Sequence, residues 1–335
     1  VGSEMCIRDR HYPDATNDDI LNAIADIYGM NKNQIVVGNG AAELLYAICR
    51  LPGYTGAFVP APGFSEYKAA LEASRIPVRD IYYRPREDEH GKPYFEVPYL
   101  ALETFAAELK GQDGRIIVFL GNPNNPDGTL LDKNHILTIA SMLKDANSLL
   151  VIDESFIDFV GNDTLQDNEY SMRSLVNEFD NIIVVHSFTK FYAVPGLRIG
   201  AAFSNPLIIE QLNSFIPTWS VNTLAQSYTE AALNDVEYVK RTKQVLHEEQ
   251  LFMYNSLDTL DGITVYPPSA NFMLFHIEQE GITAESINEA LKKHNMIVRN
   301  CDSYMGLNNQ WVRVAIKDHD TNVKLVEKLT DILKV

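Results

Sequence analysis

Positive charge is scarce in this sequence. Its 335 residues include 28 lysines and arginines but 45 aspartates and glutamates, which gives a formal net charge of −17 at pH 7. Nucleic acids and anionic membranes are bound by basic surfaces, so this balance argues against both as partners. A strongly acidic surface also keeps a protein soluble, and that is the ordinary reason for such a charge. If the ligands are anions, a few local cations must hold them, which makes each arginine in an apolar segment informative.

Cysteines and long apolar runs are scarce as well. The three cysteines, Cys6, Cys49 and Cys301, have neither disulfide nor metal-site spacing. They fit a reducing, cytoplasmic compartment, and we expect no metal site. No apolar run is long enough to span a bilayer, so no membrane partner is expected.

What the sequence does contain is an alternation of short β-branched runs and amphipathic helical patterns. Helical patterns cover residues 18–28, with Thr16 as the expected cap, and residues 133–145. Between such patterns stand apolar runs such as RIIVFL, LLVID and NIIVV. This alternation predicts an α/β fold with a mostly parallel central sheet sandwiched by helices.

The predicted domain organisation follows from the same reading. A long helical stretch is expected to leave the sheet domain and lead to a smaller α+β lobe. The predicted parts are a non-native scar at 1–10, an N-terminal segment of the small domain at 11–30, a large ligand-binding domain at 31–222, a connecting helix at 223–257 and a small C-terminal domain at 258–335. The scar is inferred because VGSEMCIRDR matches neither a signal peptide nor a periodic element.

Four predicted strands end in polar groups, and ligands of open α/β sheets bind beyond such carboxyl ends. The strand ends carry Gly40, Asn125, Asp153 and Lys190. The turn that ends at Gly40 opens a helix at Ala41 and Ala42, whose backbone N–H groups can hold a phosphate. Glycines at such a junction are more often ordinary turn residues, and neither G-x-G-x-x-G nor a P-loop lysine is present.

Each charged group at this rim has a structural explanation beside the functional one. Asp153 either caps the following helix or keeps a heterocyclic nitrogen protonated. Lys190 either extends to solvent or, with a lowered pKa, forms a Schiff base with a carbonyl. Arg198 has mostly apolar neighbours in sequence and therefore needs a fixed anionic partner.

Together these groups match the needs of pyridoxal phosphate, which are an amine for its aldehyde, an acid for its ring nitrogen and a cationic nest for its phosphate. Lys190 is predicted to hold the aldehyde and Asp153 the ring nitrogen. The other predicted contacts are Ser187, Thr189 and Arg198 to the phosphate, Asn125 to the ring hydroxyl, and Phe64 to the ring face.

The segments GNGAAELLY, NNPDG, VIDES and SFTKFYAVPGLRIG resemble the class I/II aminotransferase family of fold-type I pyridoxal-phosphate enzymes. The resemblance extends from His11 to the C-terminus and implies the fold of that family. It also implies that Lys190 is the Schiff-base lysine, that Asp153 pairs with the pyridine nitrogen, and that Asn125 binds the ring hydroxyl. Tyr12 matches a tyrosine that reaches the cofactor phosphate of the neighbouring subunit, which implies a homodimer with shared active sites.

Two arginines near the C-terminus bear on the substrate. Arg299 and Arg313 both interrupt apolar strands, and two such residues on neighbouring strands suggest two anionic groups on the ligand. By resemblance, Arg313 holds the amino acid carboxylate and Arg299 a substrate phosphate. Two branches use this pair, the histidinol-phosphate aminotransferases and the threonine-phosphate decarboxylases of cobalamin biosynthesis.

Several stretches, including PAPGFSEY and VRNCDSYMGL, are more similar to the decarboxylase branch, which predicts a lyase acting on a small phosphorylated amino acid. Phe156 stands where aminotransferases of this class usually have a tyrosine that donates to the cofactor hydroxyl. Transamination remains the alternative, and a cofactor-binding regulator or inactive relative is a third that the filled catalytic positions disfavour. Both branches also begin with an Asn-Pro-rich segment that helps to close the substrate site. Because VGSEMCIRDR occupies its place here, we expect cofactor binding with poor turnover.

Overall fold

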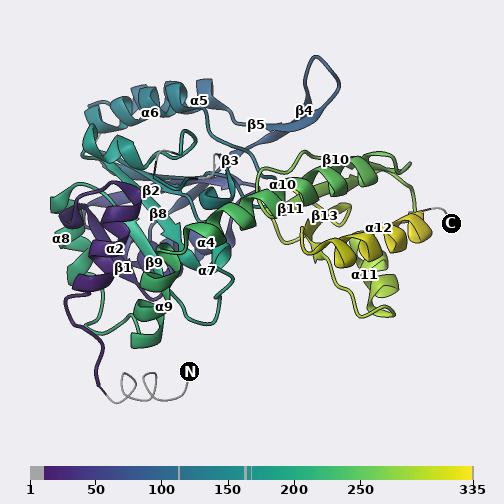
Figure 1. Cartoon of the computed structure of the whole chain (residues 1–335). Helices are drawn as coiled ribbons and strands as arrows, with labels where there is room; N and C mark the ends of the chain where they lie inside the picture. Colours follow the sequence, from purple (N-terminus) through teal and green to yellow (C-terminus); the bar gives the residue numbers. More distant parts are fainter. Residues whose placement is uncertain (1–10, 112–113, 162–163, 167, 334–335) are drawn as a thin grey trace.

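The computed structural model describes residues 11–111, 114–161, 164–166 and 168–333. The predicted scar at 1–10 lies outside these residues. A large layered domain and a smaller lobe that contains the C-terminal end of the described chain stand side by side, joined by a long helix (Figure 1). This arrangement confirms the predicted fold class, whereas the exact domain boundaries stay a prediction.

The large domain is built on a seven-stranded sheet with the order β1-β9-β8-β7-β6-β2-β3. Five neighbouring strands of this sheet run parallel, namely β8, β7, β6, β2 and β3. Strand β9 runs antiparallel to both β8 and β1. The strands are β1 (Ile35–Gly38), β2 (Tyr54–Ala61), β3 (Val78–Tyr82), β6 (Arg115–Gly121), β7 (Leu149–Asp153), β8 (Ile182–Ser187) and β9 (Gly200–Phe203). All residues of β7 and β8 are buried, as expected for strands covered on both faces.

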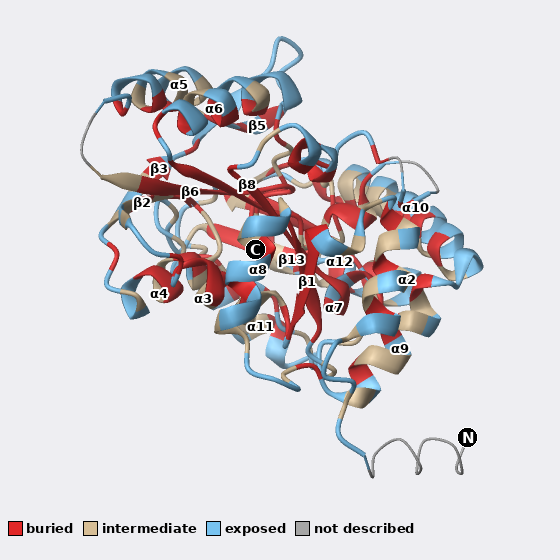
Figure 2. Cartoon of the chain, turned by 90° about the vertical axis from the view of Figure 1, so that its left-hand side faces the viewer, coloured by how far each residue is buried: buried red, intermediate tan, exposed pale blue. Residues whose placement is uncertain are grey.

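Helices cover both faces of this sheet, and Figure 2 shows its buried strands between helices with exposed outer sides. One face packs against α2 (Asp18–Tyr28), α5 (Tyr99–Glu108), α6 (Lys133–Asp145) and α9 (Thr223–Leu233). The other face packs against α3 (Ala41–Ile48), α4 (Ser65–Ala73) and α8 (Pro206–Phe215). Side chains alternate between these faces along each strand, so in β7 Leu150 and Ile152 belong to the first core and Leu149 and Val151 to the second.

The smaller lobe contains a four-stranded antiparallel sheet with the order β10-β11-β13-β12. Its strands are β10 (Ile263–Val265), β11 (Phe272–Ile277), β12 (Arg299–Asn300) and β13 (Trp311–Ala315), and its helices are α11 (Ala284–Lys292) and α12 (His319–Leu333). These elements form a separate apolar core with the end of α10 (Val236–Asp258). Short elements complete the described chain: η1 (Lys32–Gln34), the hairpin β4 (Arg84–Glu87) and β5 (Pro93–Glu96), η2 (Ile157–Phe159), η3 (Arg173–Asn177) and α7 (Phe188–Phe191).

Two local expectations differ from the structure. The single helical stretch predicted at 223–257 is two helices, α9 and α10, because Asp235 starts a new one by accepting a hydrogen bond from the backbone N–H of Tyr238. Thr16 does not cap α2. Asp14 accepts the backbone N–H of Asp18 instead, and the hydroxyl of Thr16 donates to the same carboxylate.

None of the helices in the described ranges combines the length and the apolar character needed to cross a membrane.

Candidate active site

The start of α3 and Arg198 form a compact cationic cradle. Gly40, the residue before the helix, has a φ of 82° and lies so close to Arg198 that a Cβ atom on it would be 2.4 Å from Nη2 of the arginine. The strand β9 approaches from the other side, since a Cβ on Gly200 would be 2.6 Å from the backbone nitrogen of Ala41. Backbone N–H groups at a helix start next to a guanidinium are suited to an anion such as a phosphate.

Two hydroxyls lie next to Lys190. Ser187 ends β8 and its Oγ lies 2.8 Å from Oγ1 of Thr189, which in turn accepts a hydrogen bond from Nζ of Lys190 at 3.2 Å. The short helix α7 that follows β8 presents the lysine at the carboxyl edge of the sheet. Lys190, Ser187 and Thr189 therefore lie together, as predicted.

The amine of Lys190 has a lowered pKa. Partial desolvation of the amine in the mouth of the site is the main cause. The nearby carboxylate of Asp153 opposes the shift, while the positive charges of Arg198 and Arg313 add to it. Asp153, Arg198 and Arg313 are thus within electrostatic reach of Lys190, and the net effect makes its amine easier to deprotonate into the nucleophilic form.

Asp153 is held at the end of β7 by three donors. By the alternation along β7 it faces α3 and α4, where the hydroxyl of Tyr67 donates to its Oδ2 at 2.8 Å. The backbone N–H and the hydroxyl of Ser155 donate to its Oδ1 at 2.9 and 2.6 Å. Burial, followed by the charge of Asp153, raises the pKa of Tyr67 well above its usual value, so Tyr67 stays a donor. The sequence did not reveal Tyr67 or Ser155 as partners of Asp153.

Asn125 brings the two lobes together. Its Oδ1 accepts a hydrogen bond from Nη1 of Arg313 on β13 and another, at 3.1 Å, from the hydroxyl of Tyr304. Since a guanidinium can only donate, the amide oxygen must face Arg313, and the amide Nδ2 must face the other way. Tyr304 is another contact that the sequence analysis missed.

The two substrate-site candidates on the small lobe are direct neighbours. Arg299 on β12 pairs across the ladder with Arg313 on β13. Arg299 also donates to Oγ of Ser303 at 3.1 Å, and its guanidinium lies 5.6 Å from the ring centroid of Tyr304. A cleft of about 410 Å³ between the lobes is lined by Arg299, Ser303 and Tyr304 and by Phe64, which precedes α4.

Phe156 belongs to an aromatic wall behind the lysine. Its ring centroid lies 5.8 Å from Nζ of Lys190 and 5.0 Å from the ring of Phe272, which packs edge to face against it. The guanidinium of Arg313 lies 5.2 Å from the centroid of Phe272. A phenylalanine here supplies apolar surface but no hydrogen-bond donor.

Tyr12 has no contact with this group among the described residues. It is 79% exposed and stacks on Trp219, with the ring centroids 4.5 Å apart. Its predicted role at a neighbouring subunit therefore stays a prediction.

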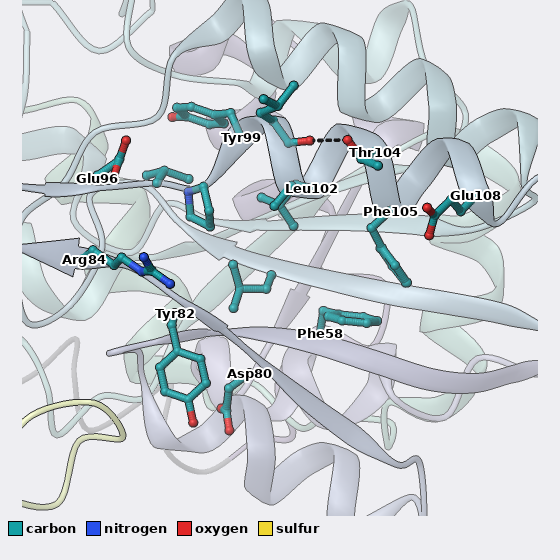
Figure 3. A pocket seen from close by; sticks show the side chains of 15 residues that line it. Phe58, Asp80, Tyr82, Arg84, Glu96, Tyr99, Leu102, Thr104, Phe105 and Glu108 are labelled. Atoms are coloured by element: carbon teal, nitrogen blue, oxygen red, sulfur yellow. Dashed lines mark hydrogen bonds between the residues drawn. The ribbon is translucent and has the colours of Figure 1, made fainter.

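A large pocket lies away from this group of residues. A pocket of about 980 Å³ lies between β3 and α5 and is lined by residues such as Phe58, Tyr82, Leu102 and Phe105 (Figure 3). It contains none of the predicted site residues. The candidate active site is consequently defined by its chemistry, not by the size of its cavity.

The group of side chains around Lys190 fits pyridoxal phosphate. The cradle at Gly40 leaves room for a phosphate only because no side chain fills it. An amine with a lowered pKa, a buried carboxylate and an amide with a free donor correspond to the aldehyde, the ring nitrogen and the ring hydroxyl of that cofactor.

Comparison with known proteins agrees with this fit. The family model described as aminotransferase class I and II matches residues 6–329. The chain is 31% identical to the threonine-phosphate decarboxylase of Salmonella typhimurium over 96% of its own length and 83% of that protein. It is 27% identical to the histidinol-phosphate aminotransferase of Methanosphaera stadtmanae, with 96% and 83% covered.

A longer relative is the adenosylcobalamin biosynthesis bifunctional protein CobDQ of Leptospira interrogans, to which the chain is 32% identical. The match covers 96% of this chain and 35% of that protein, so the chain spans about a third of its length.

Solved structures show the same fold. The histidinol-phosphate aminotransferase from Clostridium acetobutylicum superposes with a TM-score of 0.86 at 25% identity, covering 99% of this chain and 93% of that one. The L-threonine-O-3-phosphate decarboxylase from Porphyromonas gingivalis gives 0.81 at 24% identity, with the same coverage. A histidinol-phosphate aminotransferase from Sinorhizobium meliloti in complex with pyridoxal-5'-phosphate gives 0.80 at 20% identity, covering 99% and 85%. The chain therefore belongs to the class I and II aminotransferase family, and its cofactor is pyridoxal phosphate.

Proposed function

We propose that the protein is a lyase that decarboxylates L-threonine O-3-phosphate to (R)-1-aminopropan-2-ol O-phosphate, a reaction of cobalamin biosynthesis. The observation that carries the proposal is the pairing of Arg299 and Arg313 on adjacent strands, where Arg313 also donates a hydrogen bond to Asn125. Threonine phosphate carries a phosphate and a carboxylate on one small molecule, so a single substrate occupies both arginines. The names of two relatives point the same way, a threonine-phosphate decarboxylase at 31% identity and an adenosylcobalamin biosynthesis bifunctional protein at 32%.

The roles of the cofactor-site residues follow from their contacts. Asp153 keeps the cofactor ring nitrogen protonated, and Tyr67 and Ser155 hold its carboxylate in place. Asn125 donates its free Nδ2 to the ring hydroxyl, and Phe64 covers the ring face. The phosphate contacts are Gly40, Ala41, Ala42, Ser187, Thr189 and Arg198.

Bound pyridoxal phosphate supplies an electron sink for the bond at Cα that breaks. The protein would select the reaction by fixing the torsion about Cα, which decides which bond at that carbon breaks. Arg299, by holding the phosphate, and Arg313, by holding the carboxylate, would fix that torsion so that the bond to the carboxylate is the one that breaks. As carbon dioxide leaves, Nζ of Lys190 would supply the proton that takes its place on Cα.

A histidinol-phosphate aminotransferase is the second candidate, because the structure from Clostridium acetobutylicum superposes with a TM-score of 0.86. Histidinol phosphate has a phosphate but no carboxylate, so it would leave Arg313 without its anion until 2-oxoglutarate enters. Phe156, which donates no hydrogen bond next to Lys190, supports the decarboxylase.

We further propose that the protein is a homodimer in which Tyr12 contacts the cofactor phosphate of the neighbouring subunit. Its ring is largely exposed and it lies on Trp219, which is itself 46% exposed. A second copy would cover both rings.

The test supplies the holoenzyme with carboxyl-labelled O-phosphothreonine and measures released carbon dioxide. A parallel reaction contains histidinol phosphate and 2-oxoglutarate and measures glutamate. We expect carbon dioxide from the wild type and none from Lys190→Ala, which also loses the visible absorbance of lysine-bound cofactor. Glutamate formation without carbon dioxide release would show that the second candidate is right.

A further inference from the structure

The loop after β12 holds Tyr304 rigidly beside Asn125. The backbone N–H of Cys301 donates to the carbonyl of Trp311 on β13 at 3.0 Å, which fixes the loop to the small sheet. The N–H of Tyr304 then donates to the carbonyl of Cys301, and the N–H of Leu307 to that of Tyr304, both at 3.0 Å. The side chain of Tyr304 is thus presented by two successive turns rather than by a free loop.

Within the described ranges, the hydroxyl of Tyr304 has one acceptor, Oδ1 of Asn125, at 3.1 Å. The same oxygen accepts from Arg313, so two donors on the small lobe hold the oxygen of an amide on the large lobe. Among the described residues none accepts a hydrogen bond from Nδ2 of Asn125, so this group is available to a ligand. An amide with both oxygen lone pairs engaged has one orientation.

We propose that Tyr304 is a positioning residue of the active site, whose hydroxyl fixes the Asn125 amide so that Nδ2 faces the cofactor hydroxyl. The inference rests on the proposed function, which assigns Asn125 to that hydroxyl. Because Phe156 donates nothing there, the strength of the Asn125 hydrogen bond sets the charge on the cofactor oxygen. Tyr304 also contacts the guanidinium of Arg299, and so it lies between the anion site and the cofactor site.

The consequence is measurable without turnover. A donor to the ring oxygen stabilises its negative charge and weakens its hold on the proton shared with the nitrogen of Lys190. When that donor is misplaced, the nitrogen keeps its proton to higher pH, so the pKa of the lysine-bound cofactor rises. A spectrophotometric pH titration of the visible absorbance reports this pKa directly.

The experiment titrates the holoenzyme as wild type, Tyr304→Phe, Asn125→Ala and the double variant. Tyr304→Phe keeps the ring and removes one hydroxyl, and we expect it to raise the pKa by about 0.5, the effect of one weakened neutral hydrogen bond. In the Asn125→Ala background the same substitution is expected to cause no further rise, because its effect passes through the amide. The matched control is Tyr94→Phe on β5, which removes a hydroxyl from a ring that is 43% exposed.

Each result decides between the claims. An unshifted pKa in Tyr304→Phe, or an equal shift with and without Asn125, overturns the positioning role and leaves the proposed function standing. A wild type that forms no visible band with the cofactor overturns the cofactor-site assignment and this inference together. A shift in Tyr94→Phe as large as that in Tyr304→Phe shows a general effect of hydroxyl loss and also overturns the inference.

Discussion

Gly40 is a residue at which a single added carbon would disturb the cofactor cradle. Its φ of 82° is unfavourable for any residue with a side chain, and a Cβ would meet Nη2 of Arg198 at 2.4 Å. The end of an arginine side chain can move away at little cost, so Gly40→Ala should fold. The displaced group is the one that holds the phosphate. We therefore expect the affinity for pyridoxal phosphate to fall about tenfold to a hundredfold, the effect of one lost charge-assisted hydrogen bond.

The matched control for this substitution is Gly91→Ala. Gly91 has a similar φ of 76°, but a Cβ on it would meet nothing within 4 Å. Both variants place a side chain at a positive φ, and only Gly40→Ala also disturbs Arg198. Titration of the apoprotein with cofactor, followed by fluorescence or visible absorbance, measures the difference. Equal affinities in the two variants would contradict the role of the cradle.

Whether a site residue is recognisable from the sequence depends on its position relative to the predicted strands. Lys190 and Asp153 are charged residues at the ends of apolar strands, and such a position is visible in the sequence alone. Tyr67 and Tyr304 are not visible in this way, since their partners Asp153 and Asn125 lie 86 and 179 positions away. Only the fold decides that these hydroxyls meet those acceptors.

At the level of elements, the helices with a strong apolar period were predictable. The bounds predicted for α2 and α6 are those of the structure, because their apolar residues recur with helical spacing between clear end signals. The break between α9 and α10 was missed, because helix-forming residues continue on both sides of Asn234 and Asp235. The antiparallel direction of β9 was not predictable either, because a short apolar run does not indicate the direction of a strand.

A buried group of charges ties several of these elements together. Arg173 on η3 lies 3.9 Å from a carboxylate oxygen of Glu154 and 4.0 Å from one of Asp158. His186 on β8 and Tyr28 on α2 contact Oδ2 of Asp158 at 3.0 and 2.8 Å. All five side chains are buried, so the group joins α2, η3, β8 and the segment that follows β7.

We expect Arg173→Met to destabilise the protein by about 3 to 5 kcal/mol, because it leaves buried carboxylates without their cation. Burial raises the pKa of Asp158, but His186, Arg173 and Tyr28 outweigh it and hold that pKa below its usual value. A carboxyl with a depressed pKa contributes stability above its unfolded pKa and loses it as the pH falls through the folded one. The decrease in the free energy of unfolding should therefore have its full size at pH 7 and be smaller in acid. Urea unfolding measures it.

The control for the buried group is Arg86→Met. Arg86 pairs with Glu96 at 2.9 Å, and about half of each side chain is exposed. Such a surface pair contributes no more than about 1 kcal/mol. If both substitutions changed the free energy of unfolding equally, the buried group would have no special structural role.

For the whole molecule, the active site depends on how the two lobes meet. The hydrogen bond between Asn125 and Arg313 joins residues 188 positions apart, one on each lobe. The sequence predicted that both residues belong to the site, and the fold class was predictable from the alternation of helices and strands. Their direct contact was not predictable, because it depends on the placement of the small sheet against the large one.

The proposed dimer leads to a prediction for the whole molecule. If Tyr12 serves the neighbouring subunit, a site combines Lys190 of one chain with Tyr12 of the other. Mixing Tyr12→Ala chains with Lys190→Ala chains, with unfolding and refolding to exchange subunits, then rebuilds one intact site in each mixed dimer. Random pairing makes half of the dimers mixed, so about a quarter of all sites should be intact.

The measurement is the affinity for pyridoxal phosphate and the decarboxylation rate, before and after exchange. Lys190→Ala alone is expected to be inactive, and Tyr12→Ala alone to bind the cofactor weakly. The expected gain is a population of tight, active sites of about a quarter of the total, which neither parent contains. Tyr12→Ala combined with Lys190→Ala in one chain, mixed with the wild type, is the control and gives no gain. If Tyr12 acts within its own chain, the exchanged mixture shows only the sum of its parents, and the shared site is excluded.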